Sequence, residues 1–471
     1  MIDFPLTKDE WYKLRDDRTR RLEEVTGFED KSVGVIVNPE VSSSYPIQAM
    51  TLITLNMLAR WCRKIAIQIP SDTISCLPNY HKKDFCEILK NNLSEADPYG
   101  QFAFKDVEKE AYNQTLFIGK AEENRYDDKA VWIDGCGWIA GVAYNAPQDI
   151  LNECKQSNPI GPAFASCLGV AELFRRAIGL LPSSTEPSWY SLYDLKKADS
   201  PLSIQNPPFI SNFNFGRIHQ VGCGAVASCL DFLLPLTNWT SEIFLIDDDR
   251  VEVSNCNRSL SFSAWDAVSK RAKVDVCADA LQSTTTMKAI SFNGTYGNFI
   301  GQGKFLDFPP DLILCLANDH NVWGDIQNNY PPLVFHATTT KSWGINFGRH
   351  IPKKEWCVIC RFRDEMNLSL TPICGESEVS IKKTEGESTI EGVLPFLSPA
   401  AAILTMAEMA KIPLAGYPMN DDFIEFSLRN IDGNFVQSQR KHLEECLCKD
   451  QPISLYPKEI TSGKFWHLTE N

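Results

Sequence analysis

A glycine turn followed by an acidic strand end carries the most distinctive chemistry of this 471-residue chain. The turn has the form G-x-G-x-x-A and begins at Gly222, between an apolar strand over 218–221 and an apolar helix over 228–236. Glycines let the backbone approach a phosphate, and a helix N-terminus offers free N–H groups to it. The next apolar strand, 243–246, ends at Asp247, where a carboxylate can hydrogen-bond ribose hydroxyls. This pattern predicts a nucleotide site.

A polar loop after that strand indicates which nucleotide is bound. The run reads DDDRVEVSNCNR over residues 247–258. A dehydrogenase has no evident use for Asn255 and Arg258 in such a loop, whereas an enzyme that holds a triphosphate does. An ordinary dinucleotide-binding fold with a polar loop is the alternative interpretation.

The stretch resembles the adenylating domain of the ThiF/MoeB and ubiquitin-activating enzyme superfamily, which shows a glycine turn and then D-x-D-x-V-x-x-S-N-L-x-R. Cys256 replaces the usual Leu, and the other positions match at Asp247, Asp249, Val251, Ser254, Asn255 and Arg258. The resemblance implies that a carboxylate attacks the α-phosphorus of ATP and pyrophosphate leaves. That reaction needs positive charge and a divalent cation near the phosphates more than it needs a base.

The resemblance also implies a nucleotide-binding role for individual residues. Family members carry a lysine after the Arg, in a G-x-x-K-like turn; Lys273 fits this place if a short insertion is allowed, and Lys270 is the alternative. The glycine turn would lie under the phosphates, and the polar loop would contact the phosphate chain. The residues expected to bind ATP are Gly222, Gly224, Ala225, Asp247, Asp249, Asn255, Arg258 and Lys273, of which Arg258 and Lys273 would also assist catalysis.

A magnesium ligand is expected after the apolar strand over 311–316. The family follows this strand with T-D-N, and this chain has Ala-Asn-Asp-His over 317–320. A strict register places Asn318 at the metal position, and a shift of one residue places Asp319 there. Because a hard cation favours a carboxylate over an amide oxygen, Asp319 is the preferred ligand.

Residues 1–195 are expected to form a degenerate copy of the same fold. Strand, helix and strand patterns over 33–37, 47–62 and 65–69 repeat the Rossmann-like order, but the turn between them lacks a glycine fingerprint. The predicted fold is thus α/β, with two Rossmann-like ThiF-type adenylation domains packed as a pseudo-dimer. An unrelated α/β domain is the alternative. We expect the domains at 1–195 and 209–450, a linker at 196–208 and a C-terminal tail at 451–471.

A basic cluster lies in the charged helical pattern over residues 8–25, which contains Arg18, Arg20 and Arg21. A solvated helix face is the plain interpretation. The family often supplies an arginine to the phosphates from the partner domain, in a helix before its first strand. Arg21 stands closest to that place and is the expected catalytic arginine.

Cysteines in the C-terminal half predict a metal site and a nucleophile. Zinc takes four thiolates tetrahedrally, usually as two close pairs, and the pairs here are Cys357, Cys360, Cys446 and Cys448. The family has such a structural zinc, although its second pair normally has two intervening residues and here has one. A disulfide is the alternative. Cys374, in a loop over about 361–395, stands where ubiquitin-activating enzymes place the cysteine that takes the activated carboxyl as a thioester.

Composition narrows the compartment and the partners. The chain shows no apolar run of transmembrane length and no signal-peptide pattern at its start, and its 16 cysteines suggest reduced thiols in the cytoplasm. A net charge of −14 argues against nucleic acid or anionic membrane as the main partner. The charge fits a partner with a basic face.

The resemblance therefore predicts an ATP-, Mg²⁺- and Zn²⁺-dependent enzyme that adenylates the C-terminal glycine of a ubiquitin-like protein. The enzyme would then form a thioester on Cys374 and pass the modifier to a conjugating enzyme. The tail over 451–471 is too short for a ubiquitin-like domain, which suggests a minimal system of bacterial type. The alternatives are a ThiF/MoeB-like adenylyltransferase for a sulfur-carrier protein, an NAD-dependent oxidoreductase and a non-catalytic scaffold. Homodimerisation stays open.

Overall fold

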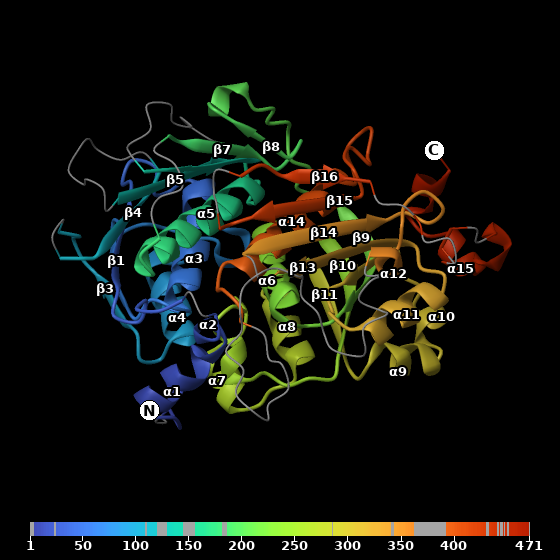
Figure 1. The fold of residues 1–471 in the computed structure, drawn as a ribbon, viewed down its shortest axis with the longest axis horizontal. Coiled ribbons are helices and arrows are strands. Elements are labelled where there is room, and N and C mark those ends of the chain that lie inside the picture. Colours follow the sequence, from blue (N-terminus) through green and yellow to red (C-terminus); the bar gives the residue numbers. More distant parts are fainter. Residues whose placement is uncertain are drawn as a thin grey trace.

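Two eight-stranded sheets, one in each half of the chain, form the framework of the protein (Figure 1), seen here in a computed structural model. The structure describes residues 4–470 with the following exceptions: 23–24, 109–110, 120–129, 145–155, 181–185, 285, 341–342, 362–391, 430–432, 440–441, 443–445, 447 and 450–451. We call residues 4–198 the N-terminal unit and residues 209–470 the C-terminal unit.

The N-terminal unit is built on a sheet with strand order β3-β2-β1-β4-β5-β6-β7-β8, parallel from β3 to β5 and antiparallel from β5 to β8. Its elements are α1 (Lys8–Arg15), α2 (Asp17–Arg20), β1 (Ser32–Val37), α3 (Tyr45–Ala59), β2 (Lys64–Gln68), α4 (Phe85–Ala96), β3 (Gln101–Phe104), β4 (Gln114–Ile118), β5 (Ala130–Cys136), β6 (Ile139–Ala143), α5 (Ile160–Ala177), β7 (Ser188–Ser191) and β8 (Lys196–Ala198). The strand β8 lies at the start of the segment that was expected to be a linker.

The C-terminal unit repeats this plan with strand order β11-β10-β9-β12-β13-β14-β15-β16. Its elements are β9 (Asn214–Val221), α6 (Ala225–Leu233), β10 (Thr240–Asp247), α7 (Ala264–Val268), α8 (Lys273–Leu281), β11 (Met287–Asn293), α9 (Tyr296–Gly301), α10 (Lys304–Asp307), β12 (Leu312–Cys315), α11 (His320–Asn328), β13 (Leu333–Thr339), β14 (Gly344–His350), α12 (Val358–Arg361), α14 (Leu397–Lys411), β15 (Phe423–Ser427), β16 (Val436–Ser438) and α15 (Lys458–Thr461).

The two strand orders are the same when each unit is numbered from its own first strand. Both sheets are parallel through their first five strands and antiparallel through the last three pairings. A shared order of eight strands is far more specific than a general α/β composition. The predicted arrangement of two Rossmann-like units is therefore confirmed at the level of the sheets.

Equivalent buried helices join the units, because α5 packs against α14 between the sheets (Figure 1). Each helix carries an Ala-Glu pair with a fully buried glutamate, Glu172 in α5 and Glu408 in α14. A basic residue follows each glutamate by three positions and pairs with it. Arg175 Nε lies 3.3 Å from Glu172, and Lys411 Nζ lies 2.6 Å from Glu408. The same charged pair thus recurs at the same place in both units.

The prediction of one helical segment over 8–25 is wrong in one respect, because the chain turns at Asp16 and forms two short helices, α1 and α2. Asp16 is buried, and its carboxylate accepts hydrogen bonds from Arg15 Nε at 2.7 Å and Arg63 Nη2 at 2.8 Å. The turn directs α2 toward the C-terminal unit. Its Thr19 hydroxyl there accepts a hydrogen bond from Asn257.

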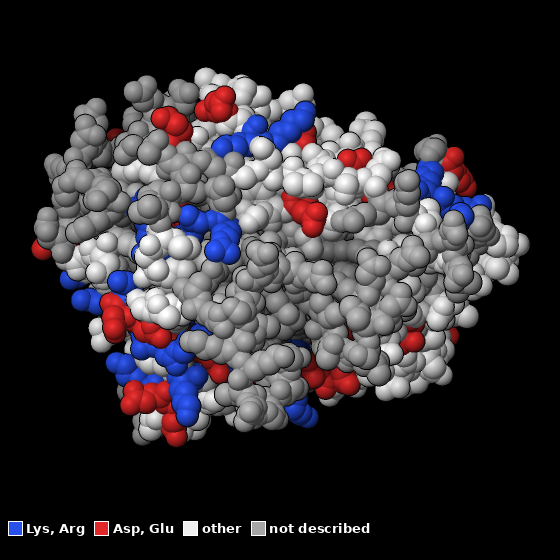
Figure 2. Space-filling view, in the orientation of Figure 1, with Lys and Arg blue, Asp and Glu red and all other residues white. Residues whose placement is uncertain are grey.

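Charged side chains of both signs are interspersed on the face drawn in Figure 2, most visibly around α1 and α4. Within the described residues, none of the helices combines the length and apolar character needed to cross a membrane.

Replacing Glu408 by Ala should destabilise the protein strongly. The change leaves Lys411 and Arg349, both nearly inaccessible to solvent, without their shared carboxylate. Breaking a buried pair from one side costs about 3–5 kcal/mol. Urea unfolding measures the loss. Glu87→Ala is the matched control, because Glu87 and Lys90 form a pair of the same spacing on the surface; an equal effect of the two changes would contradict the prediction.

Candidate functional site

The glycine turn lies at the carboxyl end of β9 and leads directly into α6. Gly222 has a φ of +93°, and a Cβ there would lie 2.7 Å from the backbone nitrogen of Ala317, so the position requires glycine. Gly224 is the N-cap of α6, and a Cβ built on it meets no atom within 4 Å. The space beside Gly224 and the N-terminal N–H groups of α6, which begins at Ala225, together suit a phosphate.

Asp247 is fixed at the end of β10 by two backbone amides. Its carboxylate accepts hydrogen bonds from the N–H of Cys223 at 2.6 Å and from the N–H of Asp249 at 2.8 Å. Burial raises the pKa of Asp247, while Lys273 and the two backbone hydrogen bonds oppose that rise. The carboxylate therefore ties the glycine turn to the first residues of the polar loop.

Of the two candidate lysines, Lys273 is the one that faces the acidic run. Its Nζ lies 2.6 Å from Asp249 Oδ2, and its backbone N–H donates to the Asp249 carbonyl at 3.0 Å. Lys270 is exposed, and its carbonyl accepts a hydrogen bond from Arg250 at 2.8 Å. The geometry favours Lys273 as the cation beside the nucleotide turn.

Asn255 and Arg258 are both buried within the polar loop. Asn255 Oδ1 accepts a hydrogen bond from the N–H of Glu252 at 2.9 Å. Arg258 Nη1 donates to the Ser254 carbonyl at 2.6 Å and to Asn257 Oδ1 at 2.7 Å. These contacts fix the shape of the loop that also carries the expected phosphate-binding groups.

The N-terminal unit reaches this loop through α2. Asn257 Nδ2 donates to Thr19 Oγ1 at 3.1 Å, and Thr19 donates in turn to the carbonyl of Val393 at 3.2 Å. Arg21, the expected arginine, is the C-cap of α2 and pairs with Asp17 at 2.9 Å. The helix that carries Arg21 therefore lies against the polar loop.

Asp319, the expected magnesium ligand, is an exposed residue that caps α11. Its Oδ1 accepts a hydrogen bond from the N–H of Asn321 at 2.7 Å. Among the described residues, Asp247, Asp248 and Asp249 form the one group of three or more carboxylates close enough to one another to share a cation, and Asp319 is outside that group. Asp319 as a magnesium ligand stays a prediction.

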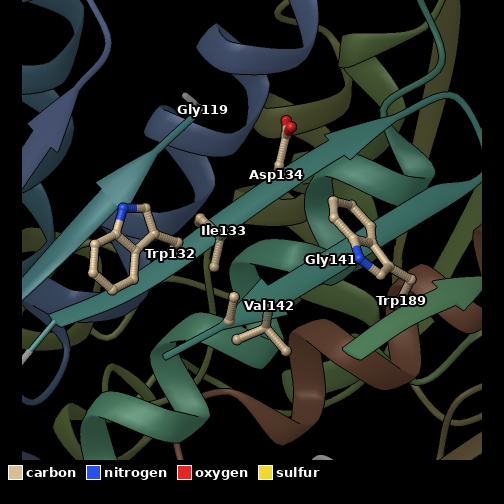
Figure 3. A pocket seen from close by; sticks show the side chains of 8 residues that line it. Gly119, Trp132, Ile133, Asp134, Gly141, Val142 and Trp189 are labelled. Carbon is tan, nitrogen blue, oxygen red and sulfur yellow. The ribbon is translucent and has the colours of Figure 1, made fainter. Parts of the chain in front are cut away.

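The N-terminal unit has a hollow of different chemistry, which lies against β5, β6 and β7 rather than at the end of β1 (Figure 3). The ring of Trp189 covers Gly141 there, and a Cβ on Gly141 would lie 2.3 Å from the indole. Trp132 and Asp134 also line this hollow, and the described residues around it include no basic side chain. Such a surface does not suit a triphosphate.

Four cysteine thiols converge as the sequence predicted. Cys357 directly precedes α12 and Cys360 lies within it, and the other pair lies after β16. The sulfur–sulfur distances are 3.4 Å for Cys357 to Cys446, 3.5 Å for Cys360 to Cys448, 3.8 Å for Cys357 to Cys360 and 3.2 Å for Cys446 to Cys448. A tetrahedral Zn–S distance of about 2.3 Å implies sulfur–sulfur separations of about 3.8 Å. The donor set and spacing therefore fit zinc.

Three further features decide how complete the candidate site is. His442, which sequence reasoning did not select, has its Nδ1 3.2 Å from Cys448 Sγ, close enough to orient that thiolate. Cys374, which is the cysteine expected to act as the nucleophile, lies outside the residues that the structure describes. Sequence reasoning also missed Arg60 and Asn56 of the N-terminal unit, which hydrogen-bond carbonyls at the end of the polar loop and just after it. No motif marks them, because their partners are distant backbone atoms.

A buried polar cluster under the glycine turn was also missed. Asp231 on α6 accepts a hydrogen bond from Gln220 Nε2 at 2.9 Å, and both side chains are fully buried. Burial raises the pKa of Asp231 to about 7, although Cys277 and Gln220 act to lower it. A charged residue within an apolar helix was the available signal.

Comparison with known proteins agrees with this geometry. The ThiF family model matches residues 209–448, and the model described as BilD N-terminal domain matches residues 32–188. The chain therefore belongs to the ThiF family, a family of ATP-dependent adenylating enzymes, and joins its ThiF domain to a BilD-type N-terminal domain.

The comparison with solved structures gives more distant similarities. Escherichia coli MccB with ATP is 17% identical, has a TM-score of 0.36 and aligns over 50% of this chain and 66% of its own. MccB in complex with N-formylated MccA is 18% identical, has a TM-score of 0.36 and aligns over 50% of this chain and 67% of its own. PaaA is 16% identical, has a TM-score of 0.35 and aligns over 48% of this chain and 64% of its own. The chain thus spans about two thirds of each of these proteins. The comparison with curated proteins returns no match.

The cysteine cluster should hold about one zinc ion per chain. Changing Cys360 to Ser removes a thiolate and should abolish stoichiometric zinc in the purified protein, as measured by atomic absorption. The control is Cys86→Ser, because Cys86 is buried in α4, far from the cluster in sequence. Equal zinc content in the two variants would exclude this site.

Asp231 should make stability depend on pH. The folded chain keeps this proton up to about pH 7, whereas an unfolded aspartate releases it near its ordinary pKa of 3.8. The contribution is therefore full below pH 3.8 and is lost as the pH rises through about 7, because the unfolded state then binds fewer protons. Asp231→Asn lacks this titration. As the pH rises from 3.8 to about 7, the free energy of unfolding of the variant should therefore increase relative to that of the wild type.

Urea unfolding at pH 4.5, 5.5 and 7.5 measures the difference for Asp231→Asn, with the exposed Asp279→Asn on α8 as the control. Parallel pH curves for Asp231→Asn and the wild type would contradict the assignment.

Proposed function

We propose that this ThiF-family enzyme activates a ubiquitin-like protein. A carboxylate oxygen of the modifier's C-terminal glycine attacks the α-phosphorus of ATP, the bond to the bridging oxygen breaks, and pyrophosphate leaves. The thiolate of Cys374 then attacks the acyl carbon of the adenylate, AMP leaves with its oxygen, and a thioester remains. The thioester passes to a conjugating enzyme.

The observation that carries this proposal is that two units share one strand order while one of them carries the candidate nucleotide site. Only the C-terminal unit combines the glycine turn, Asp247 and the S-N-x-x-R loop, and helix α2 of the N-terminal unit lies against that loop. A fused inactive copy supports activation of a ubiquitin-like protein over sulfur-carrier activation, in which two identical chains pair.

The residues of the site have distinct proposed roles. The N-terminal N–H groups of α6 and the turn at Gly222 hold phosphate oxygens, and Asp247 holds the ribose. Arg258 and Lys273 neutralise charge that develops on the leaving pyrophosphate. Arg21 adds a cation from the other unit, as the family resemblance suggests. The reaction also needs a magnesium ion, with Asp319 as its proposed ligand; zinc stays structural, since its four thiolates leave no open position.

Adenylation and thioester formation can be tested in one incubation with ATP, Mg²⁺ and candidate modifiers that end in glycine. We expect ATP–pyrophosphate exchange and a thiol-sensitive adduct that disappears in Cys374→Ala but persists in Cys76→Ala. Exchange should fall about 100-fold or more in Arg258→Ala, because one lost donor to developing charge has that effect. Arg250→Ala, from the same loop but exposed, is the matched control and should keep its activity.

The outcomes separate the steps. Exchange without an adduct would reduce the function to adenylation, as in a sulfur-carrier adenylyltransferase. Absence of exchange with every modifier tested would overturn the proposal.

A further inference from the structure

The segment that follows Asn255 is built around a guanidinium from the other unit. Arg60, the C-cap of α3, is 2% exposed. Its Nη1 donates to the carbonyls of Cys256 at 2.7 Å and Phe262 at 3.1 Å, and its Nη2 donates to the carbonyl of Leu260 at 2.8 Å. Three carbonyls that span residues 256–262 thus converge on one side chain.

Asn56 completes this contact one helical turn earlier on α3. Its Oδ1 accepts from Arg60 Nε at 2.7 Å, which orients the guanidinium, and its Nδ2 donates to the Leu260 carbonyl at 3.1 Å. Among the described residues, no carboxylate forms an ion pair with Arg60. Burial lowers the pKa of Arg60 to about 10, so it stays charged at neutral pH.

Arg258 lies in the middle of the clamped segment. On its other side, helix α6 holds the same segment: Cys229 Sγ donates to the Arg258 carbonyl at 3.3 Å, and Ser261 donates to the Ser228 carbonyl at 2.6 Å. The segment is therefore fixed between α6 of its own unit and α3 of the other. A backbone held at 256, 260 and 262 has little freedom at 258.

We propose that Arg60 is a positioning residue for the nucleotide site, which from the unit without that site fixes the backbone that aims Arg258 at the phosphates of ATP. This inference rests on the proposed function for the role of Arg258. The nucleotide site is then complete only when the N-terminal unit is docked. The inactive copy supplies a required part of the site through α3, in addition to any arginine from α2.

Arg60→Met tests the clamp, because methionine fills much of the volume but donates no hydrogen bonds. We expect faster amide hydrogen exchange over 256–262 and a fall of about 100-fold in the kcat of pyrophosphate exchange, as misplacement of one catalytic group produces. The KM for ATP should change less than kcat. Arg60→Lys keeps the charge but not the fork of donors, so it should give intermediate values.

Met57→Ala is the matched control for lost stability. Met57 is fully buried in α3, three residues before Arg60, and its sulfur lies 3.9 Å from Cys167 Sγ of α5. It should lower Tm while leaving kcat and loop exchange within twofold of the wild type. Equal kcat in Arg60→Met and Met57→Ala would overturn the inference. If Arg60→Met fails to fold, the test falls to Arg60→Lys. A kcat and a rate of loop hydrogen exchange equal to those of the wild type in Arg60→Lys would then overturn the inference.

Failure of the proposed function gives a different result. In that case the wild type shows no pyrophosphate exchange with any modifier, while hydrogen exchange still decides whether Arg60 orders residues 256–262. Unchanged exchange of these amides in both Arg60 variants would exclude the clamp, whatever reaction the enzyme catalyses.

Discussion

The polar loop over residues 247–258 and the segment after it depend on hydrogen-bond donors from the other unit. Cys256 near the end of this loop and Leu260 beyond it are buried, and a buried carbonyl without a donor costs free energy. The guanidinium of Arg60 and the amide of Asn56, both from α3, satisfy them. Asn257 likewise finds Thr19 of α2. The same hydrogen bonds therefore join the two units and fix the shape of the site.

The two units share one strand order but differ in the side chains that their sheets carry. The shared strand order and the buried pairs at Glu172 and Glu408 record the common plan. The glycine turn and the S-N-x-x-R loop occur in one unit only. In the other unit, the indole of Trp189 lies over Gly141. One copy thus carries the nucleotide chemistry while the other supplies structural support for it.

Two clusters of buried charge in this fold are compensated by ion pairs. Glu408 lies between Lys411 and Arg349, and Asp16 lies between Arg15 and Arg63. Zinc at the four cysteines would similarly neutralise thiolates that hold α12 to the segment after β16. Such contacts link segments that are distant in sequence, so they hold the helices and loops in fixed positions against the two sheets.

The sequence by itself determined many of the elements and the family. Apolar runs and the glycine turn were sufficient for β1, β2, β9, β10 and the helices α3 and α6, because local periodicity and turn chemistry act over a few residues. The cysteine pairs, together with the family resemblance, likewise predicted a cluster. Only the tertiary structure decided that Lys273 rather than Lys270 approaches Asp249, and that Arg60 serves the opposite unit. These contacts join backbone and side-chain atoms far apart in the chain, and no sequence pattern records where such atoms meet.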